Sequence, residues 1–206
     1  MKNNYIIIGD SIVYGIGDCE SNGWTSMFKN YVMSLDEGSI SCSNYVHIVG
    51  FPDAVSNDIS LRIRGILETF RFDGVNNEVI LSIGINFCKS VNKNIKEDID
   101  VFSKNIIDII SQVKISGCNI TVLGIMEVSD DCQCKPGVVF DNDIIDLYDE
   151  ILCDICLNNS VGYVRMRDLL EYDDYIDGLH PNHQGHLKIF KKIKKEILAN
   201  ERQRLL

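Results

Sequence analysis

The chain has 206 residues, of which 45% are hydrophobic, and this suits one domain with a sizeable core, here predicted to span residues 1–206. The formal net charge of −10 at pH 7 argues against a nucleic-acid partner, because binding to a phosphate backbone requires clustered positive charge. Four lysines near the end do cluster, and we interpret them as the solvated last turn of a helix, where cations suit the helix dipole. They are Lys191, Lys192, Lys194 and Lys195.

The sequence gives no sign of a membrane segment or an export signal. Its first residues lead into a short apolar run at 5–8, which is too short for the hydrophobic region of a signal peptide. No other stretch reaches the roughly 18 apolar residues that a membrane span needs. We therefore expect no membrane span and a cytoplasmic protein, whose eight cysteines are reduced thiols rather than a disulfide framework.

Short apolar runs alternate along the chain with longer segments of helical periodicity. This is the pattern of a mostly parallel sheet covered by helices on both faces. The expected strands are 4–9, 45–49, 78–83, 119–124 and 162–165. Apolar residues at helical spacing predict helices across 24–35, 59–70, 102–113, 144–155 and 187–197.

Polar residues follow four of these strands. Ser11 follows the first, the segment 50–53 the second, Asn86 the third, and Asp177 with His180 lie beyond the fifth. Because functional residues of parallel sheets lie just beyond the carboxyl ends of the strands, we expect these side chains to share one rim.

Ser11, His180 and Asp177 supply the groups that nucleophilic catalysis needs. A serine hydroxyl attacks a carbonyl only when a base takes its proton and a carboxylate orients that base. Gly178 lets the chain between Asp177 and His180 curl, since it has no Cβ to clash. Pro181 is expected to fix the first turn of the last helix.

Three blocks of the sequence carry a resemblance to a known family. They are Gly9-Asp10-Ser11-Ile12-Val13-Tyr14-Gly15, Gly84-Ile85-Asn86 and Asp177-Gly178-Leu179-His180-Pro181. Together they resemble the SGNH hydrolases, also called the GDSL esterase and lipase family, along the whole chain. The resemblance implies an α/β fold, a flavodoxin-like three-layer α/β/α sandwich with a mostly parallel five-stranded sheet. It also implies a serine hydrolase that cleaves small-molecule acyl esters, with deacetylase and thioesterase variants, and that needs no cofactor or metal ion.

The resemblance also assigns roles to residues. Ser11 would be the nucleophile, His180 the general base and then the acid, and Asp177 the group that orients the imidazole. The oxyanion hole would consist of the backbone N–H of Ser11, the N–H near Asp53 and the side-chain amide of Asn86.

Two residues depart from the family pattern. Asp53 stands where the family usually has a glycine, and Phe87 stands where an aspartate usually follows the asparagine. A carboxylate near the oxyanion hole would oppose the developing charge, unless Asp53 points away into solvent. The alternative function is therefore a non-catalytic binding protein of this fold with an impaired oxyanion hole. A nucleotide-binding protein is a third possibility, for which Gly15-Ile16-Gly17 is too short a glycine signal.

Other chemistry-bearing residues have simpler interpretations. His183 and His186 are expected at the surface of the last helix, and a metal on them and His180 is disfavoured because positions three apart drift around a helix. His47 is expected to be structural. Four cysteines could bind zinc or form a redox pair, but their spacing matches no familiar module, so Cys156 is expected in the core and the two loop thiols exposed. The four are Cys132, Cys134, Cys153 and Cys156.

The substrate and the oligomeric state are left open by the sequence. The segment 126–140 follows the fourth strand and is expected to border the acyl pocket. Acidic residues near the rim, Asp18, Glu20 and Glu127, would disfavour anionic substrates.

Overall fold

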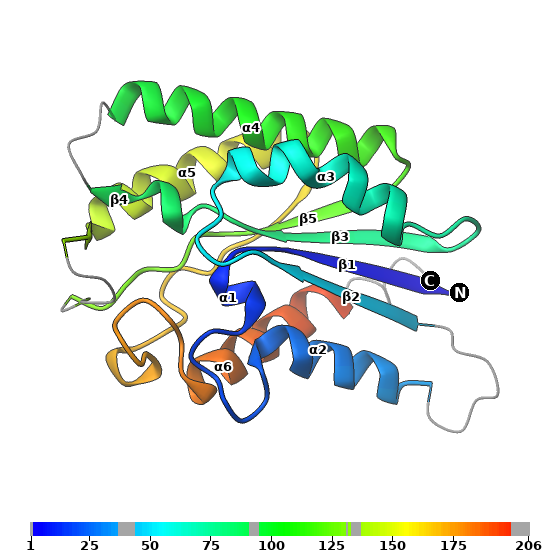
Figure 1. The fold of residues 1–206 in the computed structure, drawn as a ribbon, viewed down its shortest axis with the longest axis horizontal. Helices are drawn as coiled ribbons and strands as arrows, with labels where there is room; N and C mark the ends of the chain where they lie inside the picture. The colour runs from blue at the N-terminus through cyan, green and yellow to red at the C-terminus, as the bar shows by residue number, and fades with distance from the viewer. Residues whose placement is uncertain (1, 37–43, 91–94, 131, 133–136, 199–206) are drawn as a thin grey trace.

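A five-stranded parallel sheet in the order β2-β1-β3-β5-β7 forms the centre of the molecule (Figure 1). The computed structural model describes residues 2–36, 44–90, 95–130, 132 and 137–198. The strands are β1 (Asn3–Gly9), β2 (Asn44–Gly50), β3 (Asn76–Ser82), β5 (Asn119–Leu123) and β7 (Gly162–Val164). Each boundary lies within two residues of the one expected from the sequence, and the predicted fold class is confirmed.

Helices cover both faces of the sheet, which makes the three-layer sandwich visible in Figure 1. On one face lie α1 (Ser11–Tyr14), α2 (Gly23–Ser34) and α6 (His183–Ile193), which a π-helical turn (Lys194–Leu198) extends. On the other face lie α3 (Ser56–Phe70), α4 (Ile95–Ile115) and α5 (Asn142–Asn158). Short 3-10 turns η1 (Ile85–Phe87) and η2 (Tyr172–Asp174) follow β3 and β7.

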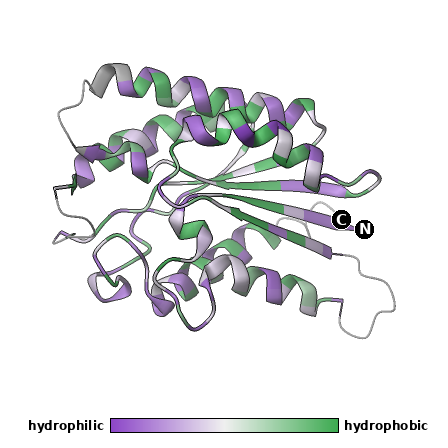
Figure 2. Ribbon diagram, viewed as in Figure 1, coloured by the Kyte–Doolittle hydropathy of each residue, from purple (hydrophilic) through white to green (hydrophobic). Residues whose placement is uncertain are grey.

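The central strand β1 divides the core into two halves. Tyr5 and Ile7 are buried among the side chains of α2 and α6, and Ile6 and Ile8 among those of α3 and α4. Because both faces of the strand are buried, its sequence is continuously apolar rather than alternating. Figure 2 shows the same distribution, with hydrophobic strands inside and hydrophilic residues on the outer sides of the helices. The carboxyl end of β1 therefore delivers Ser11 to the middle of the rim.

Two features near that rim differ from the sequence predictions. A short antiparallel ribbon of β4 (Lys89–Ser90) and β6 (Val139–Phe140) was not expected. The last helix does not begin at Pro181, because Asn182 caps it by accepting the N–H groups of Gln184 and Gly185. Among the helices that the structure describes, none has the length and hydrophobicity needed to cross a bilayer.

Candidate active site

The structure brings Ser11, His180 and Asp177 together at the carboxyl edge of the sheet. Ser11 Oγ lies 3.1 Å from Nε2 of His180, and Nδ1 of the same ring lies 2.7 Å from Oδ2 of Asp177. Ser11 is the first residue of α1, whose N-cap Asp10 accepts the N–H of Ile12. With Nδ1–H donated to the carboxylate, Nε2 is left as the acceptor for the serine hydroxyl.

The turn between Asp177 and His180 has the tight curl that Gly178 predicts. Gly178 has φ +82°, and a Cβ on it would lie 2.5 Å from Cα of Cys132. This curl allows Oδ1 of Asp177 to accept the backbone N–H groups of Leu179 at 3.0 Å and of His180 at 2.7 Å. Burial raises the pKa of Asp177, but the hydrogen bonds from the His180 ring and the two N–H groups outweigh it, so the net pKa is lowered. The carboxylate therefore stays ionised beside the imidazole.

Asp53 adopts the backbone conformation for which glycine is preferred. Its φ is +63°, in the left-handed region that asparagine and aspartate also tolerate. Its carboxylate is turned outward: the side chain is 70% exposed, and Oδ1 lies 3.4 Å from Nζ of Lys89. Of the two possibilities that the sequence left open, the structure has the one in which the carboxylate faces solvent.

Asn86 is buried in η1, and its side chain is held in place. Its Nδ2 donates to the carbonyl of Ala54 at 3.0 Å, and a second hydrogen on the same nitrogen can serve a ligand. The neighbouring Phe87 turns the other way, into the core, where its ring lies 5.4 Å from that of Phe102 and 6.2 Å from that of Tyr148. An aspartate in that apolar site would be buried without compensation, which explains the departure at this position.

A cavity of about 160 Å³ joins the candidate residues. Ser11, Asp53, Asn86 and His180 line it, and so does Lys89. The remaining wall is apolar. It consists of Ile16, Pro52, Val138, Phe140 and Leu179. Because Val138 and Phe140 belong to the segment 126–140, the prediction that this segment borders the pocket is confirmed.

Asp10, directly before Ser11, is a buried carboxylate. Burial raises its pKa to about 6, against the smaller opposing effects of the Ile12 N–H and of the charges of His180 and Lys89. It lines a separate water-sized void of about 20 Å³ together with Ser82 and Gly84. Asp10 therefore titrates within the structure without facing the larger cavity.

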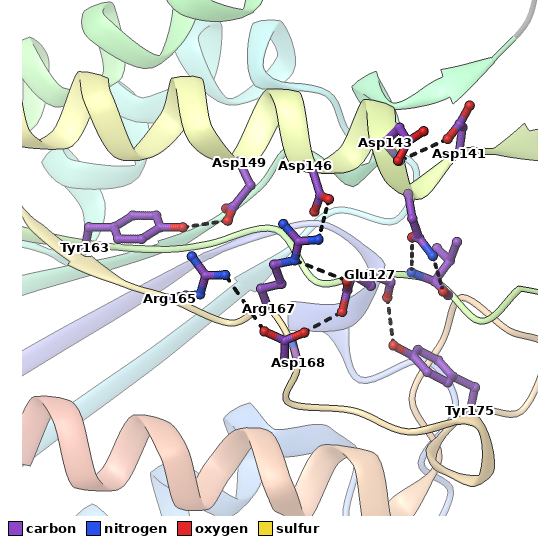
Figure 3. A network of polar contacts seen from close by, with 12 residues as sticks. Glu127, Asp141, Asp143, Asp146, Asp149, Tyr163, Arg165, Arg167, Asp168 and Tyr175 are labelled. Atoms are coloured by element: carbon purple, nitrogen blue, oxygen red, sulfur yellow. Dashed lines mark hydrogen bonds and ion pairs between the residues drawn. The ribbon is translucent and has the colours of Figure 1, made fainter.

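A polar network braces the loops that carry this site (Figure 3). Arg167, just after β7, lies 2.5 Å from Asp146 of α5 and 3.3 Å from Glu127 of the loop after β5. The hydroxyl of Tyr175 donates to the Glu127 carbonyl at 2.7 Å, two residues before Asp177. Sequence reasoning missed this network and identified Glu127 only as an acidic residue near the rim.

A second pair of contacts extends the network toward the sheet. Asp149 accepts the N–H of Ile125 and the hydroxyl of Tyr163, both at 2.7 Å. Figure 3 shows the bond from Tyr163. Burial raises the pKa of Asp149, although these two hydrogen bonds oppose it. The start of the loop after β5 is thereby fixed to α5 and β7.

The prediction of a surface position is wrong for His186, which is fully buried. Its Nδ1 accepts the N–H of Trp24 at 3.2 Å, and its Nε2 donates to the carbonyl of Ile16 at 3.0 Å. Burial lowers its pKa, so the neutral ring is the form that makes both bonds. His183 is partly exposed and lies 3.1 Å from Oδ1 of Asp18. The loop from α1 to α2 is thereby pinned to α6.

His47 and the two cysteines of α5 lie away from the rim. The His47 ring packs against those of Phe70 and Phe72, with centroids 4.7 and 5.6 Å away. Cys153 and Cys156 lie on α5, with Cys156 in the core as predicted, and Cys132 is half-buried beside Gly178 rather than exposed. Cys134 lies outside the described residues. Within the described part of the chain, no three His, Cys, Asp or Glu side chains cluster as a metal site.

Comparisons with known proteins agree with the geometry. A model of the GDSL-like lipase/acylhydrolase family matches residues 7–188. The acetylxylan esterase Axe2 from Geobacillus stearothermophilus has a similar structure, with a TM-score of 0.71 and 16% identity over 94% of this chain and 93% of that one. Est24, a carbohydrate acetylesterase from Sinorhizobium meliloti, is also similar, with a TM-score of 0.74 and 14% identity over 97% of this chain and 100% of that one.

A lipolytic G-D-S-L protein from Veillonella parvula is similar as well, with a TM-score of 0.71 and 15% identity over 95% of this chain and 98% of that one. No curated protein matches the sequence significantly. At these identities the solved structures show the fold that the chain shares with them.

Proposed function

Because the chain belongs to the GDSL-like lipase/acylhydrolase family of carboxylic ester hydrolases, we propose that it cleaves small-molecule acyl esters through an acyl-enzyme on Ser11. The observation that carries the proposal is the position of His180, whose ring contacts the Ser11 hydroxyl on one side and the Asp177 carboxylate on the other. This is the arrangement of base and orienting carboxylate that makes a serine nucleophilic near neutral pH.

The reaction proceeds in two halves. Ser11 Oγ attacks the acyl carbonyl while Nε2 of His180 takes its proton, and the tetrahedral intermediate collapses as His180 gives that proton to the leaving alcohol. Water then attacks the acyl-enzyme, with His180 again as the base, and the carboxylate is released with Ser11 restored. Asp177 stays ionised throughout and stabilises the imidazolium.

The oxyanion is held by the N–H of Ser11, the N–H of Asp53 and the side-chain amide of Asn86. All three residues line the same cavity. The outward orientation of the Asp53 carboxylate removes the main reason to expect an impaired oxyanion hole. It therefore favours catalysis over the non-catalytic binding protein.

The cavity favours short acyl groups. Its volume of about 160 Å³ is below the roughly 300–1,000 Å³ of sites for drug-sized ligands, and its apolar wall suits a small alkyl chain. An acetyl group is small enough for this cavity, and two of the similar structures are named as esterases of acetylated carbohydrates. We place acetyl and other short acyl esters ahead of long-chain lipids.

The test is hydrolysis of 4-nitrophenyl esters from acetate to palmitate. Parent and Ser11→Ala are compared, with Ser34→Ala as the matched control, since Ser34 is an exposed serine at the end of α2. We expect Ser11→Ala to lose at least about 10⁴-fold in kcat/KM, Ser34→Ala to keep the parent rate, and the parent to prefer short chains. Equal rates in parent and Ser11→Ala, at matched circular dichroism, would overturn the proposal.

A further inference from the structure

Lys89 contributes a cation to the wall of the cavity that holds Ser11 and His180. Its side chain is only 23% exposed, whereas that of Asp53, whose Oδ1 lies 3.4 Å from its Nζ, is 70% exposed. Lys89 belongs to the β4–β6 ribbon and is paired with Phe140, which lines the same cavity. The backbone of Lys89 is thus positioned at the cavity by the pairing with Phe140, and its ammonium group contacts the Asp53 carboxylate.

The bond between Lys89 and Asp53 is easily exchanged. Ion pairs with a solvent-exposed partner contribute little to stability, because the hydrated carboxylate gains little from the contact. An anion inside the sheltered cavity would interact more strongly with the same ammonium, since fewer water molecules screen it there.

The acidic residues expected to repel anions are engaged elsewhere. Asp18 accepts the N–H groups of Glu20, Ser21 and Gly23 and contacts His183. Glu127 is paired with Arg167. Asp18, Glu20 and Glu127 are absent from the described residues that line the cavity. The acidic residues behind the expectation that anionic substrates are disfavoured therefore do not line the cavity, and the one carboxylate among the described lining residues, Asp53, is paired with Lys89.

We propose that Lys89 is a specificity-determining residue that binds a carboxylate of the substrate, so that the enzyme prefers esters carrying one a few bonds from the scissile carbonyl. The inference rests on the proposed function and adds the substrate class to it. Lys89 is paired with Asp53 in the free protein, and the carboxylate of the substrate replaces that of Asp53 on binding.

The test compares esters that differ in one charge. On the acyl side, the mono-4-nitrophenyl ester of adipic acid is compared with 4-nitrophenyl hexanoate, which has the same chain length and a terminal methyl. On the alcohol side, 4-acetoxybenzoate is compared with 4-methylphenyl acetate. Each kcat/KM is divided by the spontaneous hydroxide rate of the same ester, and the ratio of anionic to neutral ester is the readout.

We expect the ratio to exceed one for at least one pair in the parent, and the responsive pair identifies the side that carries the carboxylate. Lys89→Met should lower that ratio about tenfold, whereas Lys89→Arg, which keeps the charge, should retain it. Asp53→Asn should raise it, because asparagine tolerates the same φ and no longer competes for Lys89. Added salt should shrink the ratio in the parent more than in Lys89→Met.

Three outcomes would overturn the proposal: no preference in the parent, a preference that survives Lys89→Met, or an equal loss for charged and neutral esters. The last would mean that Lys89 merely compensates Asp53. Calorimetric binding of the esters to Ser11→Ala needs no turnover, so it separates the two proposals. Tighter binding of the anionic ester that Lys89→Met abolishes supports the Lys89 site even if hydrolysis fails, and equal binding rejects it.

Discussion

The side-chain amide of Asn86 donates a hydrogen bond to the carbonyl of Ala54 at 3.0 Å, and this bond ties the turn after β3 to the loop after β2. Asp53 directly precedes Ala54, so two of the proposed oxyanion donors are fixed relative to each other across neighbouring loops. Preorganised donors of this kind need no rearrangement when charge develops on the substrate.

Replacing Asn86 by alanine should lower kcat by about 10²–10³, with a smaller effect on KM, because the lost donor acts mainly on the transition state. The bond to Ala54 is also lost, so a decrease of about 1 kcal/mol in the free energy of unfolding is expected. Steady-state kinetics and urea unfolding measure the two effects. Asn119→Ala, an exposed asparagine on β5, is the control. An unchanged kcat would remove Asn86 from the oxyanion hole.

Asp53→Gly should fold at least as stably as the parent and retain hydrolysis of neutral esters within a few-fold. Asp53 already has φ +63°, a conformation in which glycine avoids a cost of about 1–2 kcal/mol. Asp53→Val should be destabilised and should lose about 10²-fold in kcat, because a β-branched residue resists positive φ and would displace the N–H. Thermal melting and kcat of both variants test this. Equal rates in the glycine and valine variants would contradict a role for this N–H.

Asp10 should make the stability of the protein depend on pH in a defined direction. Its pKa is raised from 3.8 to about 6, so the folded protein holds this proton in a range where the unfolded chain has released it. The stabilisation is fully present below about pH 4 and is lost as the pH rises through about 6, by on the order of 3 kcal/mol.

The Asp10→Asn variant removes this titration and can still cap α1. Relative to the parent, the free energy of unfolding of the variant should therefore increase as the pH rises from about 4 to 7. Urea unfolding across that range gives the difference at each pH, in which the titration of all other groups cancels. A difference that stays constant with pH would mean that the carboxylate is not held protonated by burial.

His186→Ala should destabilise the protein by about 2–4 kcal/mol, because the N–H of Trp24 and the carbonyl of Ile16 would lose their partner inside the core. Ile16 lines the cavity, so kcat/KM of the folded fraction should fall as well. His183→Ala removes a partly exposed ring and should cost about 1 kcal/mol or less. Urea unfolding of both variants measures the two losses. An equal decrease in the free energy of unfolding would argue against this ranking.

What could be predicted from the sequence was set by short-range pattern. Strands of a parallel sheet that has helices on both faces are continuous apolar runs, so residues 5–8 alone predict β1. Ser11, Asn86 and His180 each belong to a recognisable block, and the rule that strand ends share one edge predicts that they lie together.

What was missed depends on contacts between distant segments. Lys89 and Asp53 are 36 residues apart, and no local periodicity encodes their pairing or the two-residue strands of the β4–β6 ribbon. His186 did carry a signal, because it shares a helix face with the buried Ile189 and Ile193 at spacings of three and seven. Its polar character outweighed that spacing in the prediction.

The sequence separation of 169 between Ser11 and His180 also bears on how the protein acquires activity. A nascent chain that has emerged through β5 already holds the proposed nucleophile and the turn with Asn86, yet it lacks the proposed base. Contacts of such long range form late and slow the folding of a chain. In the proposed mechanism, ester hydrolysis is thus a marker of completed folding, and no fragment ending before His180 should produce it.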